Sequence, residues 1–157
     1  MPHLAGLTYD PGAAGGCTIV EVDRDGNRIS ERVGVASTST NCAGGETPWD
    51  TWLTCEETEQ LATPGTFEKD HGYVFEVDPF DDAANRDPQP IKALGRFSHE
   101  AVAVDRRRDD VCPTEDAAGP TGRPPPACPT AGRSPRATAP VRVRCASSVP
   151  PTVCSPP

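Results

Sequence analysis

Four short stretches of the sequence contain residue types that can do chemistry. They are residues 41–45 (NCAGG), 55–57 (CEE), 99–100 (HE) and 114–116 (TED). Together they offer a soft sulfur ligand, an imidazole and several hard carboxylate oxygens. That mixture could hold a transition metal beside calcium, with acids bridging the two. Such a cluster suits phosphoryl transfer, in which cations neutralise the phosphate and a bound hydroxide attacks.

The first two stretches each leave two interpretations open. Cys42 is followed by small residues, which let the backbone approach another segment closely. Its thiolate could bind a transition metal, and the alternative is a buried structural cysteine. Glu56 and Glu57 end a predicted strand, where neighbouring side chains point to opposite faces, so one carboxylate can reach inward while the other stays wet. The alternative is a solvated acidic turn, which the nearby Glu59 favours.

The other two stretches flank predicted strands. His99 and Glu100 enter the strand at 101–104, and a histidine beside a carboxylate could serve a metal or acid–base catalysis. Glu115 and Asp116 form a further acidic pair where a strand ends. None of the four stretches identifies a function alone, and their value lies in the combination.

Alternating hydrophobic segments predict an all-β fold. Strands are predicted at 17–23, 28–35, 52–55, 73–77 and 101–104, whereas helical periodicity is weak. Three segments, 20–26, 75–81 and 102–108, share a strand that ends in Val-Asp followed by a turn. The aspartate suits the turn because its side chain can bond to the backbone two residues on. Such recurring units favour a partial β-propeller, with generic hairpins as the alternative.

Composition divides the chain of 157 residues into two parts. Residues 1–105 hold 7 Lys/Arg and 19 Asp/Glu, a net charge of −12, whereas residues 106–157 hold 8 and 4, a net of +4. The acidic part argues against nucleic acid as a partner and fits a protein that gathers cations, although most carboxylates on a surface serve solvation. The hydrophobic share of 35% predicts a thin core within one domain at most.

Cysteine spacing and hydropathy exclude several classes. The seven cysteines form no Cys-x-x-Cys motif, so a zinc ribbon is not expected. No apolar run reaches the length needed to span a membrane, and residues 1–12 lack a basic region followed by an apolar stretch. We therefore expect no membrane partner, no secretion signal in these residues, and a chain that stays cytoplasmic if it is expressed as given.

Residues 123–157 differ in amino-acid composition from the rest of the chain. They use eight amino-acid types, and ten of the 35 residues are proline. A segment without leucine, isoleucine or aromatics cannot bury enough apolar area to offset the entropy of ordering its backbone, so we expect disorder. The segment is either a natural Pro-rich linker or the product of a reading-frame shift near Gly122. The predicted division is a β domain at 1–122 and a tail at 123–157.

Four motifs make the chain resemble the central part of a PhoX-type alkaline phosphatase. They are NCAGGETPWDTWLTCEET at 41–58, HGYVFEVDP at 71–79, PIKALGRFSHEAVAVD at 90–105 and TEDAAGPTG at 114–122. The resemblance covers about residues 1–122. It implies a β-propeller, an iron and calcium centre, hydrolysis of phosphomonoesters, and export by the twin-arginine route. We also expect a monomer.

The resemblance also implies roles for the residues introduced above. Cys42 corresponds to a thiolate on iron, and Glu57 or its neighbour Glu56, together with Glu100, to carboxylate ligands. His99, Glu115 and Asp116 are carried over as residues that line the site. The implied catalytic residues are Cys42, Glu100 and His99, and the implied metal ligands are Cys42, Glu56, Glu57, Glu100, Glu115 and Asp116.

The sequence departs from the family pattern at two places. Asp50 stands where glycine is expected, which adds a charge and a Cβ to a tight segment, and Pro113 removes a strand donor. The family's later blades, which supply further ligands, have no counterpart in 123–157. Three functions therefore remain open: a phosphatase, a truncated remnant without activity, and a calcium-binding or scaffold fragment of a propeller. We expect the chain to be inactive alone.

Overall fold

The computed structural model describes residues 4–107, 110–116 and 142–143, and this part of the chain is built from short strands. The strands are β1 (Gly15–Val22), β2 (Arg28–Thr38), β3 (Asn41–Glu46), β4 (Trp52–Glu56), β5 (Val74–Val77), β6 (His99–Asp105), β7 (Asp110–Glu115) and β8 (Arg142–Val143). A 3-10 turn, η2 (Lys92–Leu94), interrupts the loop before β6. The predicted all-β fold is confirmed. None of the helices in the described ranges is long and apolar enough to cross a membrane.

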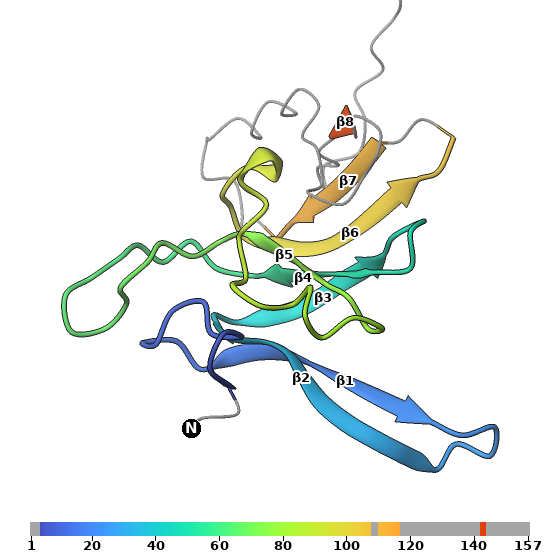
Figure 1. Ribbon diagram of the computed structural model, residues 1–157. Coiled ribbons are helices and arrows are strands. Elements are labelled where there is room, and N and C mark those ends of the chain that lie inside the picture. The colour runs from blue at the N-terminus through green and yellow to red at the C-terminus, as the bar shows by residue number, and fades with distance from the viewer. Residues whose placement is uncertain (1–3, 108–109, 117–141, 144–157) are drawn as a thin grey trace, which may run out of the picture.

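The strands form three small sheets, which follow one another in Figure 1. The β1–β2 hairpin is antiparallel, and the second sheet has the antiparallel order β3-β4-β5. In the third sheet β6 pairs antiparallel with β7, and β8 adds a short parallel pairing. That these sheets form a partial β-propeller stays a prediction. The expected disorder of 123–157 lies outside the described residues, apart from the two residues of β8.

The three Val-Asp turns form as the sequence predicts. Asp23, Asp78 and Asp105 each follow or end a strand and accept a hydrogen bond from the backbone N–H two residues on, at 2.9, 2.8 and 2.8 Å. Each aspartate therefore satisfies a backbone donor that the strand can no longer pair. The common physical cause of the three turns is confirmed.

The hydrophobic core lies between the second and third sheets. Its buried members are Leu53, Cys55, Val74, Leu94, Val102 and Val111. Leu53 and Cys55 alternate along β4 and so share one face, whereas Thr54 and Glu56 share the other. This alternation sends Leu53 and Cys55 toward the core, whereas Trp52 shares the opposite face with Thr54 and Glu56.

Strand β3 is the main element that the strand predictions missed. Residues 41–46 contain two glycines and no β-branched residue, so propensity gives no strand signal. The glycines are needed because β3 runs close to two neighbours: a Cβ at Gly44 would overlap the carbonyl oxygen of Leu53, and one at Gly45 would overlap that of Val102. The predicted close backbone approach at this segment is confirmed, and it brings β3 against β6.

The two departures from the family pattern have different outcomes. Asp50 lies in the tight turn between β3 and β4 with φ of 65°, in the left-handed region that favours glycine. The predicted burden of a Cβ there is confirmed. Pro113 does not end its strand: it stays within β7, opposite Val102 in the register.

Replacing Gly45 by alanine tests the close packing of β3. The added methyl group has no space beside the Val102 carbonyl, so we expect the free energy of unfolding to fall by about 3 kcal/mol or more. Urea unfolding measures it. The neighbouring Ala43 is exposed, and Ala43→Ser is the matched control with little expected effect. Equal stability of the Gly45→Ala variant and the parent would contradict the packing described.

Candidate functional site

Several of the predicted site residues meet where β3 begins, β4 ends and β6 begins. Cys42 is the second residue of β3, Glu57 follows the last residue of β4, and Glu100 is the second residue of β6. The Glu57 backbone N–H donates to Thr40 O at 3.0 Å, which extends the β3–β4 pairing by one residue. Fifty-eight residues of sequence separate Cys42 from Glu100, and the packing of β3 on β6 brings them together.

The Cys42 side chain connects these three strand ends. The exposed thiol donates to the carbonyl oxygens of Glu100 and His99, with sulfur–oxygen distances of 2.9 and 3.4 Å. Partial burial raises the pKa of the Cys42 thiol, the Ala43 backbone N–H opposes this by lowering it, and the negative charges of Glu57 and Glu100 raise it further. The two carboxylates therefore favour a proton, or any other cation, at this position.

The donor set fits a metal ion in kind. The negative charges of Glu57 and Glu100 both act on the Cys42 sulfur, so a cation at this position would be favoured. Within the ranges that the structure describes, however, no three His, Cys, Asp or Glu side chains are arranged to hold a metal ion. The strand ends therefore bring potential ligands near one another without assembling a coordination group.

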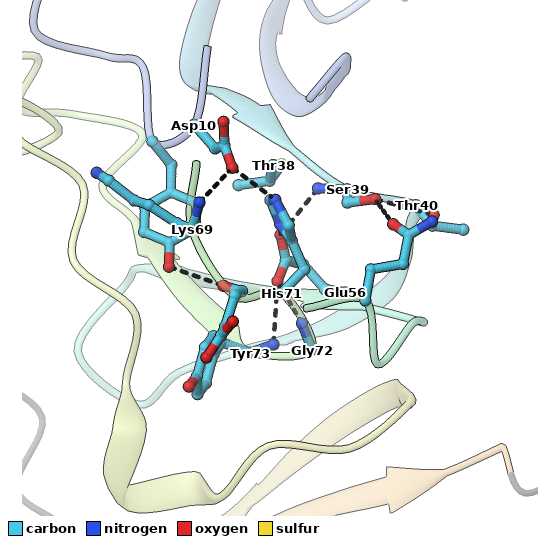
Figure 2. A network of polar contacts seen from close by, with 12 residues as sticks. Asp10, Thr38, Ser39, Thr40, Glu56, Lys69, His71, Gly72 and Tyr73 are labelled. Atoms are coloured by element: carbon cyan, nitrogen blue, oxygen red, sulfur yellow. Dashed lines mark hydrogen bonds and ion pairs between the residues drawn. The ribbon is translucent and has the colours of Figure 1, made fainter. Parts of the chain in front are cut away.

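Glu56 has a different environment from Glu57. Its side chain is fully buried, and each of its oxygens accepts hydrogen bonds. One oxygen accepts from the Ser39 backbone N–H at 2.8 Å and pairs with His71 Nδ1 at 2.7 Å. The other accepts from the backbone N–H groups of Gly72 and Tyr73 at 2.7 and 3.1 Å. Figure 2 shows these groups converging on the carboxylate. Of the two candidate glutamates, Glu57 is the one that lies beside Cys42.

Two residues of this network were not among the predicted site residues. His71 is fully buried between Glu56 and Asp10, and its Nε2 lies 3.2 Å from Asp10 Oδ2. Burial alone would raise the pKa of Asp10. Hydrogen bonds from the backbone of Gly12, Lys69 and Glu68 and from the His71 side chain hold it below the ordinary value of 3.8.

The network was hard to detect in the sequence because Asp10 and His71 are 61 residues apart. His71 begins the motif HGYVFEVDP and is one of three histidines in the sequence. Its position just before a predicted strand was the available signal. Asp10 precedes Pro11 and Gly12, which reads as an ordinary turn. Only the fold shows that these residues share one buried site.

His99 is buried rather than open to solvent. Its ring packs on Phe97 with centroids 3.6 Å apart, and Nδ1 has no hydrogen-bond partner within the described part of the chain. Burial lowers the pKa of His99 to about 4, so the imidazole is neutral at pH 7. Glu115 is its partner in the β6–β7 register, and the exposed Asp116 donates its backbone N–H to Ser98 O at 3.0 Å. The structure thus places the TED segment beside the start of β6.

The residues that carry this geometry match a known protein family. The family model described as alkaline phosphatase PhoX matches residues 11–121, which is more than half of the chain. The chain belongs to the PhoX family. This confirms the resemblance drawn from the motifs. The matched range contains all of the predicted site residues and His71, whereas Asp10 lies just before it. No curated protein sequence matches the chain.

A solved PhoX structure is also similar in sequence. It is Pseudomonas fluorescens PhoX in complex with vanadate, a transition state analogue, and the two chains are 28% identical. The match covers 64% of this chain and only 23% of that one, with a TM-score of 0.32. At this TM-score the superposition supports no conclusion about how the sheets are arranged. The chain thus spans less than a quarter of that PhoX protein.

Glu56→Gln tests the buried carboxylate of this PhoX-family chain. Glutamine keeps one acceptor oxygen, so its NH2 group would face backbone donors that the second carboxylate oxygen now accepts. We expect the free energy of unfolding to fall by about 2–4 kcal/mol in urea titrations. Glu68→Gln, at an exposed glutamate, is the matched control with little expected change. Equal losses in the two variants would show that the network does not hold the fold.

His99 predicts how stability depends on pH. Its pKa is about 4 in the folded chain, against an ordinary value of 6.5 for a histidine in water, so between these values the unfolded chain binds a proton that the folded chain does not. The His99 contribution to stability is therefore complete above pH 6.5 and is lost as the pH falls toward 4, by about 3 kcal/mol. Urea unfolding across this range checks it, with His99→Gln as the control that cannot titrate. Parallel pH curves for the two proteins would contradict the burial of His99.

Proposed function

We propose that this chain is part of an alkaline phosphatase that hydrolyses phosphomonoesters at a centre of iron and calcium. Membership of the family supports the reaction. The observation that carries the site is the meeting of Cys42, Glu57 and Glu100 at three strand ends. The substrates are phosphomonoesters, the partners include neither nucleic acid nor membrane, and the full-length protein is an exported monomer.

The proposed roles follow from the chemistry of each side chain. Cys42 would supply a thiolate to iron once its proton is displaced, and Glu57 and Glu100 would supply carboxylate oxygens. A bound cation would neutralise phosphate oxygens and activate water for in-line attack. His99 stays neutral and buried and supports the start of β6, whereas Glu115 and Asp116 line the neighbouring strand end.

We propose that the site is incomplete within these 157 residues. The described residues contain no three-ligand group, and the chain spans 23% of the solved PhoX protein. Further ligands would then come from other parts of a full-length family member. On this proposal the chain alone is a remnant without activity. A calcium-binding scaffold is the alternative, and it predicts calcium binding that does not depend on Cys42.

Assays of the purified chain with added iron and calcium test the proposal. We expect no hydrolysis of a phosphomonoester above the blank, either by the chain or by Cys42→Ala. Iron that is retained after desalting should fall in Cys42→Ala but not in Cys17→Ala, because Cys17 lies in β1 and not at the strand ends.

Two outcomes would contradict parts of the proposal. Hydrolysis by the parent chain that is lost in Cys42→Ala would refute the inactivity and leave the site standing. Equal iron retention in the parent, Cys42→Ala and Cys17→Ala would refute the role of the Cys42 thiolate.

A further inference from the structure

We infer that His71, anchored by Asp10, is a positioning residue that directs the Glu57 carboxylate toward Cys42. The inference rests on the proposed function, because it concerns the same donor set. His71 contacts Glu56 directly, and Glu56 is the residue before Glu57, so the path that we infer from His71 to Cys42 runs through Glu56. Three observations trace this path.

The first observation is that the Asp10–His71–Glu56 network ties distant backbone segments to one point. Asp10 Oδ2 accepts from the backbone N–H groups of Glu68 and Lys69 at 2.9 and 2.8 Å, and its Oδ1 accepts from Gly12 at 2.8 Å. All three side chains of the network are fully buried. Without competing water, these hydrogen bonds hold His71 in one orientation.

The second observation is that His71 fixes the end of β4. The Glu56 carboxylate is held by His71 Nδ1 and by backbone donors on both sides, including Ser39, which precedes β3. Asn41 pairs with Glu56 in the β3–β4 register. The same contacts therefore set the start of β3 and the end of β4 relative to each other.

The third observation is the alternation of side chains along β4. Glu56 points into the buried network, so the next residue, Glu57, points to the opposite face. That face also carries Cys55 and contacts β6 through the core. Asn41 donates its Nδ2 to Thr54 Oγ1 on the Glu56 side of β4, so the next residue of β3, Cys42, lies on the same side as Glu57. The negative charge of Glu57 is then near enough to raise the pKa of the Cys42 thiol. Rotation of Glu56 out of the network would move Glu57 with it.

The network is not a second reactive centre. Its three side chains have no exposed surface, and its carboxylates are occupied by backbone donors and the imidazole. A substrate could not reach them. The network can therefore act on the site only by positioning other residues. Removing contacts that orient metal ligands typically weakens metal binding by about 10-fold to 100-fold.

Cadmium binding by the full chain tests the inference, because the cadmium–thiolate absorbance reports on Cys42 directly. Because the chain has other cysteines, only the part of the absorbance that is lost in Cys42→Ala is assigned to Cys42. We expect His71→Phe to weaken cadmium binding by about 10-fold. Val111→Ala, which removes a buried core side chain in β7, is the matched control for lost stability and should change binding less than twofold. Asp10→Asn is the milder second variant in case His71→Phe does not fold.

A double-mutant cycle separates positioning from a general structural role. In a Glu57→Gln background, His71→Phe should cause no further loss of cadmium affinity, because its effect passes through Glu57. Losses that multiply in the double variant, or equal losses in His71→Phe and Val111→Ala, would overturn the inference.

Hydrogen exchange at the Glu57 amide gives a result even if cadmium does not bind through Cys42. Equal cadmium binding by the parent and Cys42→Ala would refute the proposed metal role of Cys42. The inference would then stand if His71→Phe, but not Val111→Ala, selectively speeds exchange of the Glu57 N–H, which donates to Thr40 O. Equal exchange rates in the two variants would overturn it.

Discussion

A single buried carboxylate, that of Glu56, organises the part of the fold that carries the site. A charged group removed from water is destabilising unless hydrogen bonds replace its hydration. Glu56 meets this requirement with three backbone N–H donors and the His71 ring. Because those donors come from the segment before β3 and the segment before β5, one carboxylate fixes how the strands of the second sheet begin and end.

The alternation of a β-strand then divides the two neighbouring glutamates between two tasks. Glu56 holds the fold on one face, and Glu57 reaches Cys42 on the other. The glycines of β3 complete the arrangement by letting Cys42 come within 2.9 Å of the Glu100 carbonyl oxygen. The acidic character of the site follows: a proton on the thiol is favoured, and so is a cation in its place.

The elements that the sequence could predict are those with local causes. The Val-Asp turns form because an aspartate side chain bonds to the backbone two residues on, and the positive φ of Asp50 follows from the expected glycine. The strands rich in β-branched residues were also predicted. Because neighbouring residues of a strand point to opposite faces, the sequence predicted that one of Glu56 and Glu57 could face inward. It did not predict which one.

The features that the sequence could not predict depend on contacts between distant segments. Strand β3 exists because Gly44 and Gly45 fit against Leu53 and Val102, and no local propensity signals that fit. His71 and Asp10 gain their roles only when residues far apart in sequence are buried together. The burial of His99 likewise depends on Phe97 and the packing of β6, which a histidine beside a glutamate in the sequence does not reveal.

The division of roles between Glu56 and Glu57 is the central claim, and carboxyl carbon NMR tests it most directly. Chains labelled with carbon-13 at the glutamate carboxyl groups would be titrated with cadmium, with Glu56→Gln and Glu57→Gln used to assign the signals. The account predicts that the Glu57 and Glu100 resonances shift while the Glu56 resonance stays in place. A cadmium-dependent shift of Glu56 with an unchanged Glu57 would contradict it.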